Sequence, residues 1–315
     1  QAEEAGATVM PGVKVDGLIR EGSRFVGVRA GEDELRARAV VAADGVNSFI
    51  SRGAGIRAKE PMANLAVGVK SVIGLDEETI RGRFNLTGDE GAAYAVVGDC
   101  TEGVAGGGFM YTNRESVSIG IVARLDDLAK KGKSSSDLHD HFLSHPAIAP
   151  FLEGGELLEY GCHLVAEGGE KMQHDLVRDG LVVIGDAAGF TLNTGFTVRG
   201  MDLAAGSALA AAKAVGRALE AGDCGRTSLE RYIEEYKSTF VGKDMSTYAK
   251  APAFLENEEM YGQLGELLAD VLHGVYNLDL TPRRHILPTA YGAFKASGLK
   301  IRRLARIGYQ AVRAL

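Results

Sequence analysis

The sequence has little cysteine and no long apolar run. Cys100, Cys162 and Cys224 lie far apart and form no Cys-x-x-Cys pair, which argues against a disulfide framework and against an iron–sulfur cluster. No segment approaches the ~18 consecutive apolar residues that a membrane-spanning helix needs. Hydrophobic residues make up 45% of the 315 residues, enough to bury a sizeable core. The composition therefore predicts a soluble enzyme in a reducing, cytoplasmic setting.

Negative charge is missing from the end of the chain. The net charge is −7, yet no Asp or Glu follows Asp279, whereas eight Lys and Arg residues do. Apolar residues alternate with these basic residues, which predicts a basic amphipathic helix. Such a helix contacts a membrane surface or an acidic partner, or else pairs its charges with the acidic body of the protein. Both interpretations stay open, whereas the overall acidity disfavours nucleic-acid binding.

The segment from Asp179 to Ser207 carries most of the functional information. It contains a turn signal, an apolar strand over 181–184, a carboxylate at Asp186, a glycine-rich loop, and an Ala-rich helix that begins within 195–200. Ligands of open α/β folds bind at the carboxyl ends of strands, and helix N-termini attract anions. The strand-end carboxylate can accept hydrogen bonds from a sugar-like hydroxyl, and glycines allow close backbone approach. The pattern predicts a nucleotide-cofactor site.

A second motif of the same kind lies at 39–52. An apolar strand ends in Asp44-Gly45, and Asn47-Ser48 is typical of a helix N-cap. Both motifs resemble the FAD fingerprints of the hydroxylase-like flavoprotein superfamily. The resemblance implies that Asp186 binds the ribityl chain of FAD and that Asp44 lies near the pyrophosphate, where a serine and an arginine (Ser48 and Arg52) close the turn. The implied cofactor-binding residues are Asp44, Gly45, Gly185, Asp186, Gly195, Phe196, Thr197, Arg199 and Gly200.

The superfamily's first motif is absent from this sequence. Its members begin with a strand and a Gly-x-Gly-x-x-Gly turn that holds the ADP half of FAD, and no such turn follows a strand here. The chain starts at Gln1, in a segment typical of a helix end that leads into a strand over Ala7–Met10. We therefore expect it to be the C-terminal part of a longer protein that has roughly a hundred further residues.

The element pattern predicts an α/β fold. A Rossmann-like FAD-binding domain, lacking its first strand and Gly-x-Gly-x-x-Gly turn, is expected with an inserted, mostly antiparallel sheet domain and a helical C-terminus. The predicted parts are 1–57 and 171–222 for the FAD-binding domain, 58–170 for the substrate or quinone domain, and 223–315 for the helical region with the basic tail. Strands are expected at 63–73, 92–97, 106–112, 116–123 and 156–165, and helices at 136–145, 228–248 and 262–275.

Three further stretches narrow the resemblance to one family. The sequence over 185–206, the turn that begins at Glu167, and APAFLENEEM at 251–260 resemble the FixC family of electron-transfer-flavoprotein:quinone oxidoreductases. The resemblance implies an FAD-dependent oxidoreductase that passes electrons from reduced electron-transfer flavoprotein to membrane quinone. It also implies a separate ferredoxin-like small subunit and a peripheral position on the inner face of the membrane, with contact through the basic tail. The alternatives are a geranylgeranyl-reductase-like flavoprotein that reduces isoprenoid double bonds, or a non-catalytic fragment that binds a partner.

The same resemblance points to a quinone site at Gly106, Gly107, Phe109 and Tyr111. Two glycines let a flat ring lie against bare backbone, and the aromatic side chains offer apolar faces. A glycine-rich hairpin with no chemical role is the alternative. Glu167 either lines this pocket or caps a turn.

No catalytic side chain is expected, because electron transfer between FAD and quinone needs no nucleophile. His139, His141 and His145 fall on one predicted helix, and the last two share a face. With no third ligand evident, we interpret them as part of a solvated amphipathic helix rather than as a metal site.

Overall fold

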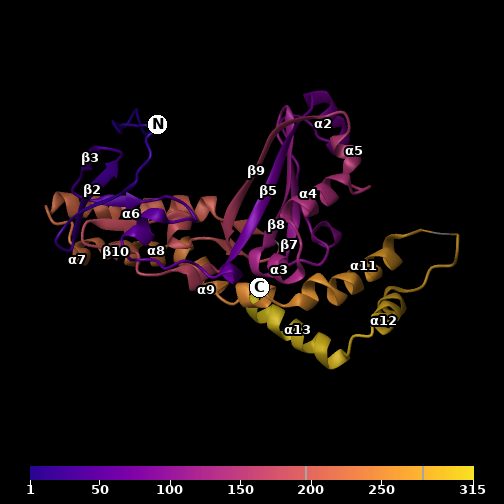
Figure 1. The fold of residues 1–315 in the computed structure, drawn as a ribbon. Helices are drawn as coiled ribbons and strands as arrows, with labels where there is room; N and C mark the ends of the chain where they lie inside the picture. Colours follow the sequence, from indigo (N-terminus) through magenta and orange to yellow (C-terminus); the bar gives the residue numbers. More distant parts are fainter. Residues whose placement is uncertain (196, 279) are drawn as a thin grey trace. The chain divides into compact units, whose positions relative to one another are not determined.

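The computed structural model describes residues 1–195, 197–278 and 280–315. It shows a mixed α/β fold whose chain divides into two compact units (Figure 1). The first unit comprises residues 1–59, 169–191 and 199–247. The second comprises residues 60–168, 192–198 and 248–315. The four-part domain assignment made from the sequence stays a prediction.

The strands β1 to β4, β10 and β11 of the first unit form two small sheets. Strand β4 (Val40–Ala42) pairs in parallel with β11 (Leu181–Val183), which pairs antiparallel with β10 (Val177–Arg178). Every residue of β11 is buried, as expected of a short apolar strand covered on both faces. The second sheet is antiparallel and has the order β1-β2-β3, formed by Gly17–Glu21, Arg24–Ala30 and Asp33–Arg36.

Helices complete the first unit. The long helix α6 (Met201–Glu220) buries small residues at helical spacing on one face, among them Ala210 and Ala214, so it can pack closely. The sequence predicted one helix over 228–248, but the chain forms three: α7 (Arg226–Leu229), α8 (Arg231–Ser238) and α9 (Phe240–Thr247). The backbone is extended at Thr239, which ends α8. The remaining helix is α1 (Phe49–Gly53).

The second unit contains a five-stranded antiparallel sheet of order β6-β7-β8-β5-β9. Buried and less buried residues largely alternate along β5, whereas most of β8 is buried, and all five predicted strands are confirmed. The predicted helix α4 (Ser135–Ser144) packs Leu138 and Phe142 into the core of the sheet. The strands are β5 (Leu65–Gly74), β6 (Ala93–Val96), β7 (Gly106–Thr112), β8 (Ser116–Arg124) and β9 (Glu156–Ala166).

Several elements of the second unit carry no clear sequence signal. Helices α2 (Glu77–Phe84), α3 (Leu125–Lys131) and α5 (Ala149–Leu152) connect the strands and are not predicted from the sequence. The C-terminal helices are α10 (Ala251–Leu255), α11 (Gln263–Tyr276), α12 (Ile286–Ala296) and α13 (Ile301–Ala314). The expected helix over 262–275 and the basic terminal helix are therefore confirmed. No helix among the described residues is both long and apolar enough to cross a bilayer.

Several short strands and 3-10 helices are also present. Strands β12 (Leu192–Asn193) and β13 (Val198–Arg199) flank the loop before α6, and short 3-10 helices occupy 62–64, 99–101, 169–172, 185–188 and 258–261. The start of the chain differs from the expectation, because residues 2–6 form turns and Ala7–Met10 is exposed and not a strand. This segment makes no ladder hydrogen bonds, so its apolar residues alone do not make it a strand.

We predict that Gly180→Ala destabilises the protein more than Gly222→Ala. Both glycines have a positive φ, +74° and +71°, so each alanine costs about 1 kcal/mol of backbone strain. A Cβ atom at Gly180 would also overlap the carbonyl oxygen of Phe25 in β2, whereas one at Gly222 meets nothing within 4 Å. Urea unfolding measures the two losses, and equal losses would contradict the packing of this turn against β2.

Candidate cofactor site

The parallel pairing of β4 with β11 brings the two predicted motifs together. Ala42 is the register partner of Val183, and the N–H of Ile184 donates to the Ala42 carbonyl at 3.0 Å. Both strands therefore end at the same edge, and Asp44 and Asp186 follow within a few residues. In open α/β sheets this carboxyl edge is where ligands bind.

Asp44 orders the turn that follows β4. Its Oδ2 atom accepts a hydrogen bond from the N–H of Ile50 at 2.8 Å, so this carboxylate supports the first turn of α1. Ser48 occupies the N-cap position as predicted, but its side chain does not cap the helix. The other carboxylate oxygen of Asp44, Oδ1, is buried and has no hydrogen-bond partner among the described residues. A buried carboxylate oxygen without a donor is costly, and a ligand that donates there would offset the cost.

Asp186 lies on the short 3-10 turn after β11 and is half-buried. Burial raises the pKa of its carboxyl group, and the nearby charge of Arg57 opposes that shift. The turn is anchored to α6, because the N–H of Gly185 donates to Ser207 Oγ at 3.0 Å. Gly200 precedes α6 and lies beside the carboxylate, with an ideal Cβ position 3.7 Å from Asp186 Oδ1. Because this carboxylate is poorly solvated, hydrogen bonds donated by a ligand would stabilise its charged form.

Arg57 fastens the two motifs to each other, a role that sequence reasoning missed. Its side chain is buried, with only 5% of the residue exposed. The Nη1 group donates to Ser48 Oγ and to the Ala187 carbonyl, each at 2.7 Å, and to the Asp186 carbonyl at 3.3 Å. Ser48 itself is fully buried and has a left-handed backbone, with φ of 49°. Arg57 therefore stabilises a strained turn and the Asp186 loop at once.

The structure corrects the expectation for Arg52. The resemblance assigned closure of the turn to this residue, but Arg52 is exposed and its side chain takes no part in the hydrogen bonds described above. The buried arginine five positions later closes the turn instead. Sequence reasoning gave no signal for this exchange, because arginines are mostly exposed and burial depends on the tertiary partner.

The remaining predicted cofactor residues are divided between the units. Arg199, in the first unit, pairs with Asp202 and Asp244 at 2.6 Å each, and these contacts raise the pKa of its guanidinium. Gly195 and Thr197 lie in the second unit, where the N–H of Thr197 donates to Thr194 Oγ1 at 3.2 Å. Phe196 lies outside the described residues.

Glu167 braces this loop of the second unit. Its Oε1 accepts from the side-chain amide of Asn193 at 3.2 Å, and Asn193 Oδ1 accepts from the N–H of Gly195 at 2.8 Å. Through Asn193, the glutamate therefore holds the start of the 193–195 turn in place. Burial raises the pKa of the Glu167 carboxyl group, and burial also raises the pKa of the Tyr261 hydroxyl to about 12.

The predicted quinone residues lie along β7. Gly107, Phe109 and Tyr111 fall on one face by the alternation of the strand, and the two aromatic rings stack with centroids 6.0 Å apart. Gly106 falls on the other face, and a side chain there would overlap the Val122 carbonyl of β8. Close packing of β7 on β8 thus requires glycine at 106, and a Cβ atom at Gly107 would likewise lie only 2.9 Å from the Val96 carbonyl of β6. The quinone site on the 107–111 face stays a prediction.

The histidines of α4 do not behave as one solvated group. His139 is buried, and its Nε2 lies 2.8 Å from Ser71 Oγ in β5, so the expectation of solvation is wrong for this residue. Burial lowers the pKa of its imidazole. His141 instead faces Asp99 at 2.7 Å. Within the described residues, no group of three or more His, Cys, Asp or Glu side chains could hold a metal ion.

Two strand-end carboxylates meet at a parallel edge, Asp44 followed by Gly45 and Asp186 preceded by Gly185, as expected of a flavoprotein oxidoreductase. No protein-family model matches the chain. It is 46% identical over 299 residues to YdiS of Escherichia coli K12, a probable electron transfer flavoprotein-quinone oxidoreductase, covering 95% of this chain and 70% of that protein. It is 42% identical over 279 residues to protein FixC of the same organism, covering 89% of this chain and 65% of FixC.

The chain therefore belongs to the family of YdiS and FixC, the electron transfer flavoprotein-quinone oxidoreductases. Solved structures agree on the fold. A geranylgeranyl bacteriochlorophyll reductase-like protein from Thermoplasma acidophilum superposes with a TM-score of 0.65 at 20% identity, covering 97% of this chain and 72% of that one. The halogenase PltM, solved with FAD, gives 0.56 at 13% identity over 99% of this chain and 60% of its own.

We predict that Arg57→Met destabilises the protein by about 2–4 kcal/mol, because it leaves the buried Ala187 carbonyl and the Ser48 turn without a charged donor. Arg57→Lys should retain part of this stability, since it keeps the charge. Arg52→Met is the matched control and should change stability by less than about 0.5 kcal/mol. Urea unfolding of the three variants tests this role of Arg57. Equal losses of stability in the two methionine variants would contradict it.

Proposed function

We propose that the protein binds FAD at the β4–β11 edge and passes electrons from reduced electron-transfer flavoprotein to membrane quinone. The observation that carries the proposal is the meeting of Asp44 and Asp186 at one parallel edge, in a chain of this family. The chain spans 65–70% of the length of the two relatives, so the activity of the whole protein is inferred from them.

The residues present fit FAD. Asp44 offers a buried oxygen that lacks a donor, and Asp186 offers a desolvated carboxylate, so both can accept hydrogen bonds from hydroxyl groups of the cofactor. Gly45 and Gly185 have φ of +72° and +60°, conformations that let bare backbone come close to a ligand. FAD, when bound, would accept electrons from one partner and release them to another.

The protein's own residues would position the cofactor and shape its surroundings. Arg57 and Asp44 would hold the two loops at a fixed separation, and Glu167 would hold the 193–195 turn. The 107–111 face of β7 would offer apolar surface to the quinone ring, through Gly107, Phe109 and Tyr111. No side chain is required to act as a nucleophile in such a transfer.

The remaining parts of the proposal come from the resemblance. The first unit is proposed to be the Rossmann-like FAD-binding domain without its first strand and Gly-x-Gly-x-x-Gly turn. A ferredoxin-like small subunit is proposed as a further partner, and the protein is proposed to act at the inner face of the membrane. Likeness to the geranylgeranyl reductase-like structure, at 20% identity, supports the fold alone and does not favour isoprenoid reduction.

We predict that the full-length protein carries an oxidised-flavin absorption band near roughly 450 nm, as any oxidised flavin does. Reduced electron-transfer flavoprotein should be reoxidised when a quinone is present, and an isoprenoid lipid should not be saturated. Parallel assays with the two acceptors measure both. A protein without flavin would contradict the proposal, and saturation of the isoprenoid in place of quinone reduction would favour the reductase.

We predict that Asp186→Ala weakens FAD binding tenfold to a hundredfold, which is roughly the 1.5–3 kcal/mol of a hydrogen bond to a charged group. Asp186→Asn should weaken it less, because an amide oxygen still accepts. Asp89→Ala, at an exposed carboxylate of the second unit, is the control. Titration of the apoprotein with FAD measures all three, and undiminished affinity of the Asp186→Ala variant would count against the site.

A further inference from the structure

Strand β9 forms an open edge of the sheet in the second unit. It is the last strand in the order β6-β7-β8-β5-β9, and among the described residues no strand pairs with its other side (Figure 1). Its first five residues are all exposed, and the exposed fraction is 58% for Leu157, 59% for Leu158 and 52% for Tyr160. A long exposed edge of this kind can pair with a strand of another chain.

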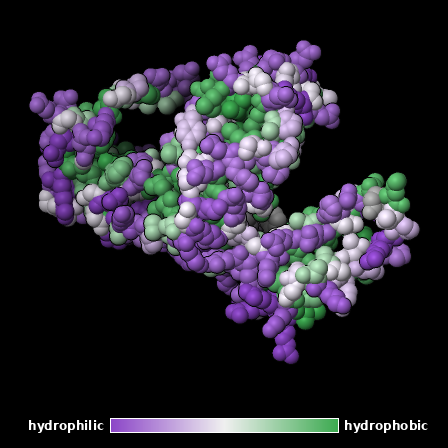
Figure 2. Space-filling view, turned by 45° about the vertical axis from the view of Figure 1, so that its right-hand side comes forward, coloured by the Kyte–Doolittle hydropathy of each residue, from purple (hydrophilic) through white to green (hydrophobic). Residues whose placement is uncertain are grey.

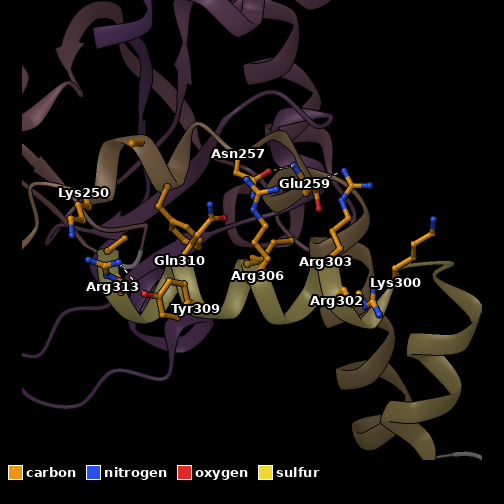
Figure 3. Close-up of a pocket in the computed structure, with 14 residues that line it drawn as sticks. Lys250, Asn257, Glu259, Lys300, Arg302, Arg303, Arg306, Tyr309, Gln310 and Arg313 are labelled. Carbon is orange, nitrogen blue, oxygen red and sulfur yellow. Dashed lines mark hydrogen bonds and ion pairs between the residues drawn. The ribbon is translucent and has the colours of Figure 1, made fainter.

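Exposed apolar side chains alone do not single out a docking surface on this protein. On the face seen in Figure 2, apolar groups are interspersed with polar ones. The groove between α10 and α13, along which Arg302, Arg306 and Arg313 lie (Figure 3), belongs to the basic tail, for which the resemblance already implies a partner. The edge of β9 differs from both, because it offers backbone donors and acceptors in a fixed register.

The pairing of β9 with β5 determines which backbone groups face outward. The N–H of Glu167 donates to the Asn64 carbonyl at 2.8 Å, in line with the register that pairs Leu65 with Ala166. Along an antiparallel strand the hydrogen-bonding direction alternates from one residue to the next. Residues 161, 163 and 165 therefore direct their N–H and C=O groups toward β5. The residues that direct these groups away from the sheet are Tyr160, Cys162 and Leu164.

The edge of β9 is complementary to a second copy of itself. In an antiparallel pair centred on Gly161, Tyr160 lies opposite Cys162 of the second copy, so two residues with outward-facing backbone groups meet and can exchange hydrogen bonds. Glu159 lies opposite His163 of the second copy, where the imidazole can donate to the carboxylate. Two-fold symmetry repeats each of these contacts.

Neighbouring registers lack this complementarity. A pair centred on Tyr160 or on Cys162 separates Glu159 from His163, and a pair centred on Glu159 places that carboxylate opposite its own copy. Opposite charges facing each other across two strands are favourable, and like charges are unfavourable. The charges therefore favour the register centred on Gly161.

We propose that two copies of this protein pair through the free edges of β9, in the antiparallel register centred on Gly161, so that their sheets join into one. The inference goes beyond the proposed function and does not depend on it, because β9 carries none of the residues predicted to bind FAD or quinone. A second copy fits this edge better than an unrelated strand, since both halves of each contact come from the same sequence.

Sedimentation velocity of the full-length protein over a range of concentrations tests the pairing. The parent should be a dimer that dissociates on dilution. Cys162→Pro removes an outward N–H and leaves the hydrogen bonds to β5 in place, since proline is tolerated on the open side of an edge strand. It should weaken dimerisation roughly tenfold or more, because symmetry removes the same bond twice. Cys162→Ser keeps the N–H and should behave like the parent.

Exchange of the two charges tests the register without a proline. Glu159→Lys alone and His163→Glu alone should each weaken the dimer, whereas the two combined should restore it, because opposite charges then face each other again. The pair of Glu159 with Lys70 within one chain, at 3.5 Å, is solvent-exposed, so its loss should leave the fold intact. Glu156→Lys, at the exposed start of the same strand, is the matched control and should dimerise like the parent.

A parent protein that stays monomeric at every concentration would overturn the proposal, and so would a dimer that Cys162→Pro leaves unchanged. Single charge variants that dimerise like the parent, or a double variant that fails to recover the dimer, would overturn the register. Circular dichroism and flavin content are measured on every variant, so loss of the fold or of the cofactor is seen separately from loss of pairing. The charge variants decide the outcome if the proline variant does not fold.

Discussion

The parallel pairing of β4 with β11 is the constraint on which the candidate site depends. It places the ends of two strands side by side although their loops are distant in sequence, since Ser48 and Ala187 are 139 positions apart. Without this ladder Asp44 and Asp186 would be unrelated carboxylates. Arg57 stabilises the same junction by donating hydrogen bonds to both loops, so one buried guanidinium links the two strand ends.

The site is polar but poorly solvated, and that combination suits a cofactor better than it suits stability. A buried oxygen of Asp44 without a donor and a desolvated Asp186 each cost folding free energy. Proteins retain such groups where a bound ligand offsets this free-energy cost, and the polar groups of a cofactor would do so here. The main core of the second unit is apolar instead, formed by side chains of the five-stranded sheet and of the helices that cover it.

Strong periodic patterns made much of the fold predictable from the sequence. The apolar strand patterns predicted β5 to β9, and the strand-end carboxylates predicted that the ends of β4 and β11 belong to one site, which agrees with their parallel pairing. What failed depended on tertiary partners: no local pattern distinguishes the buried Arg57 from the exposed Arg52, and none shows that His139 bonds to Ser71 in a neighbouring strand. The breaks between α7, α8 and α9 were missed for a similar reason, since the helical period continues across Thr239 while the backbone does not.

In the proposed function, two segments that are distant in sequence form one cofactor site. Amide hydrogen exchange of the full-length protein, with and without FAD, tests it most directly, because it reports both segments in one experiment. We expect FAD to slow exchange both at the turn after β4, including the N–H of Ile50, and at the 185–188 turn after β11. Protection of only one of these segments, or protection confined to the sheet of the second unit, would contradict it.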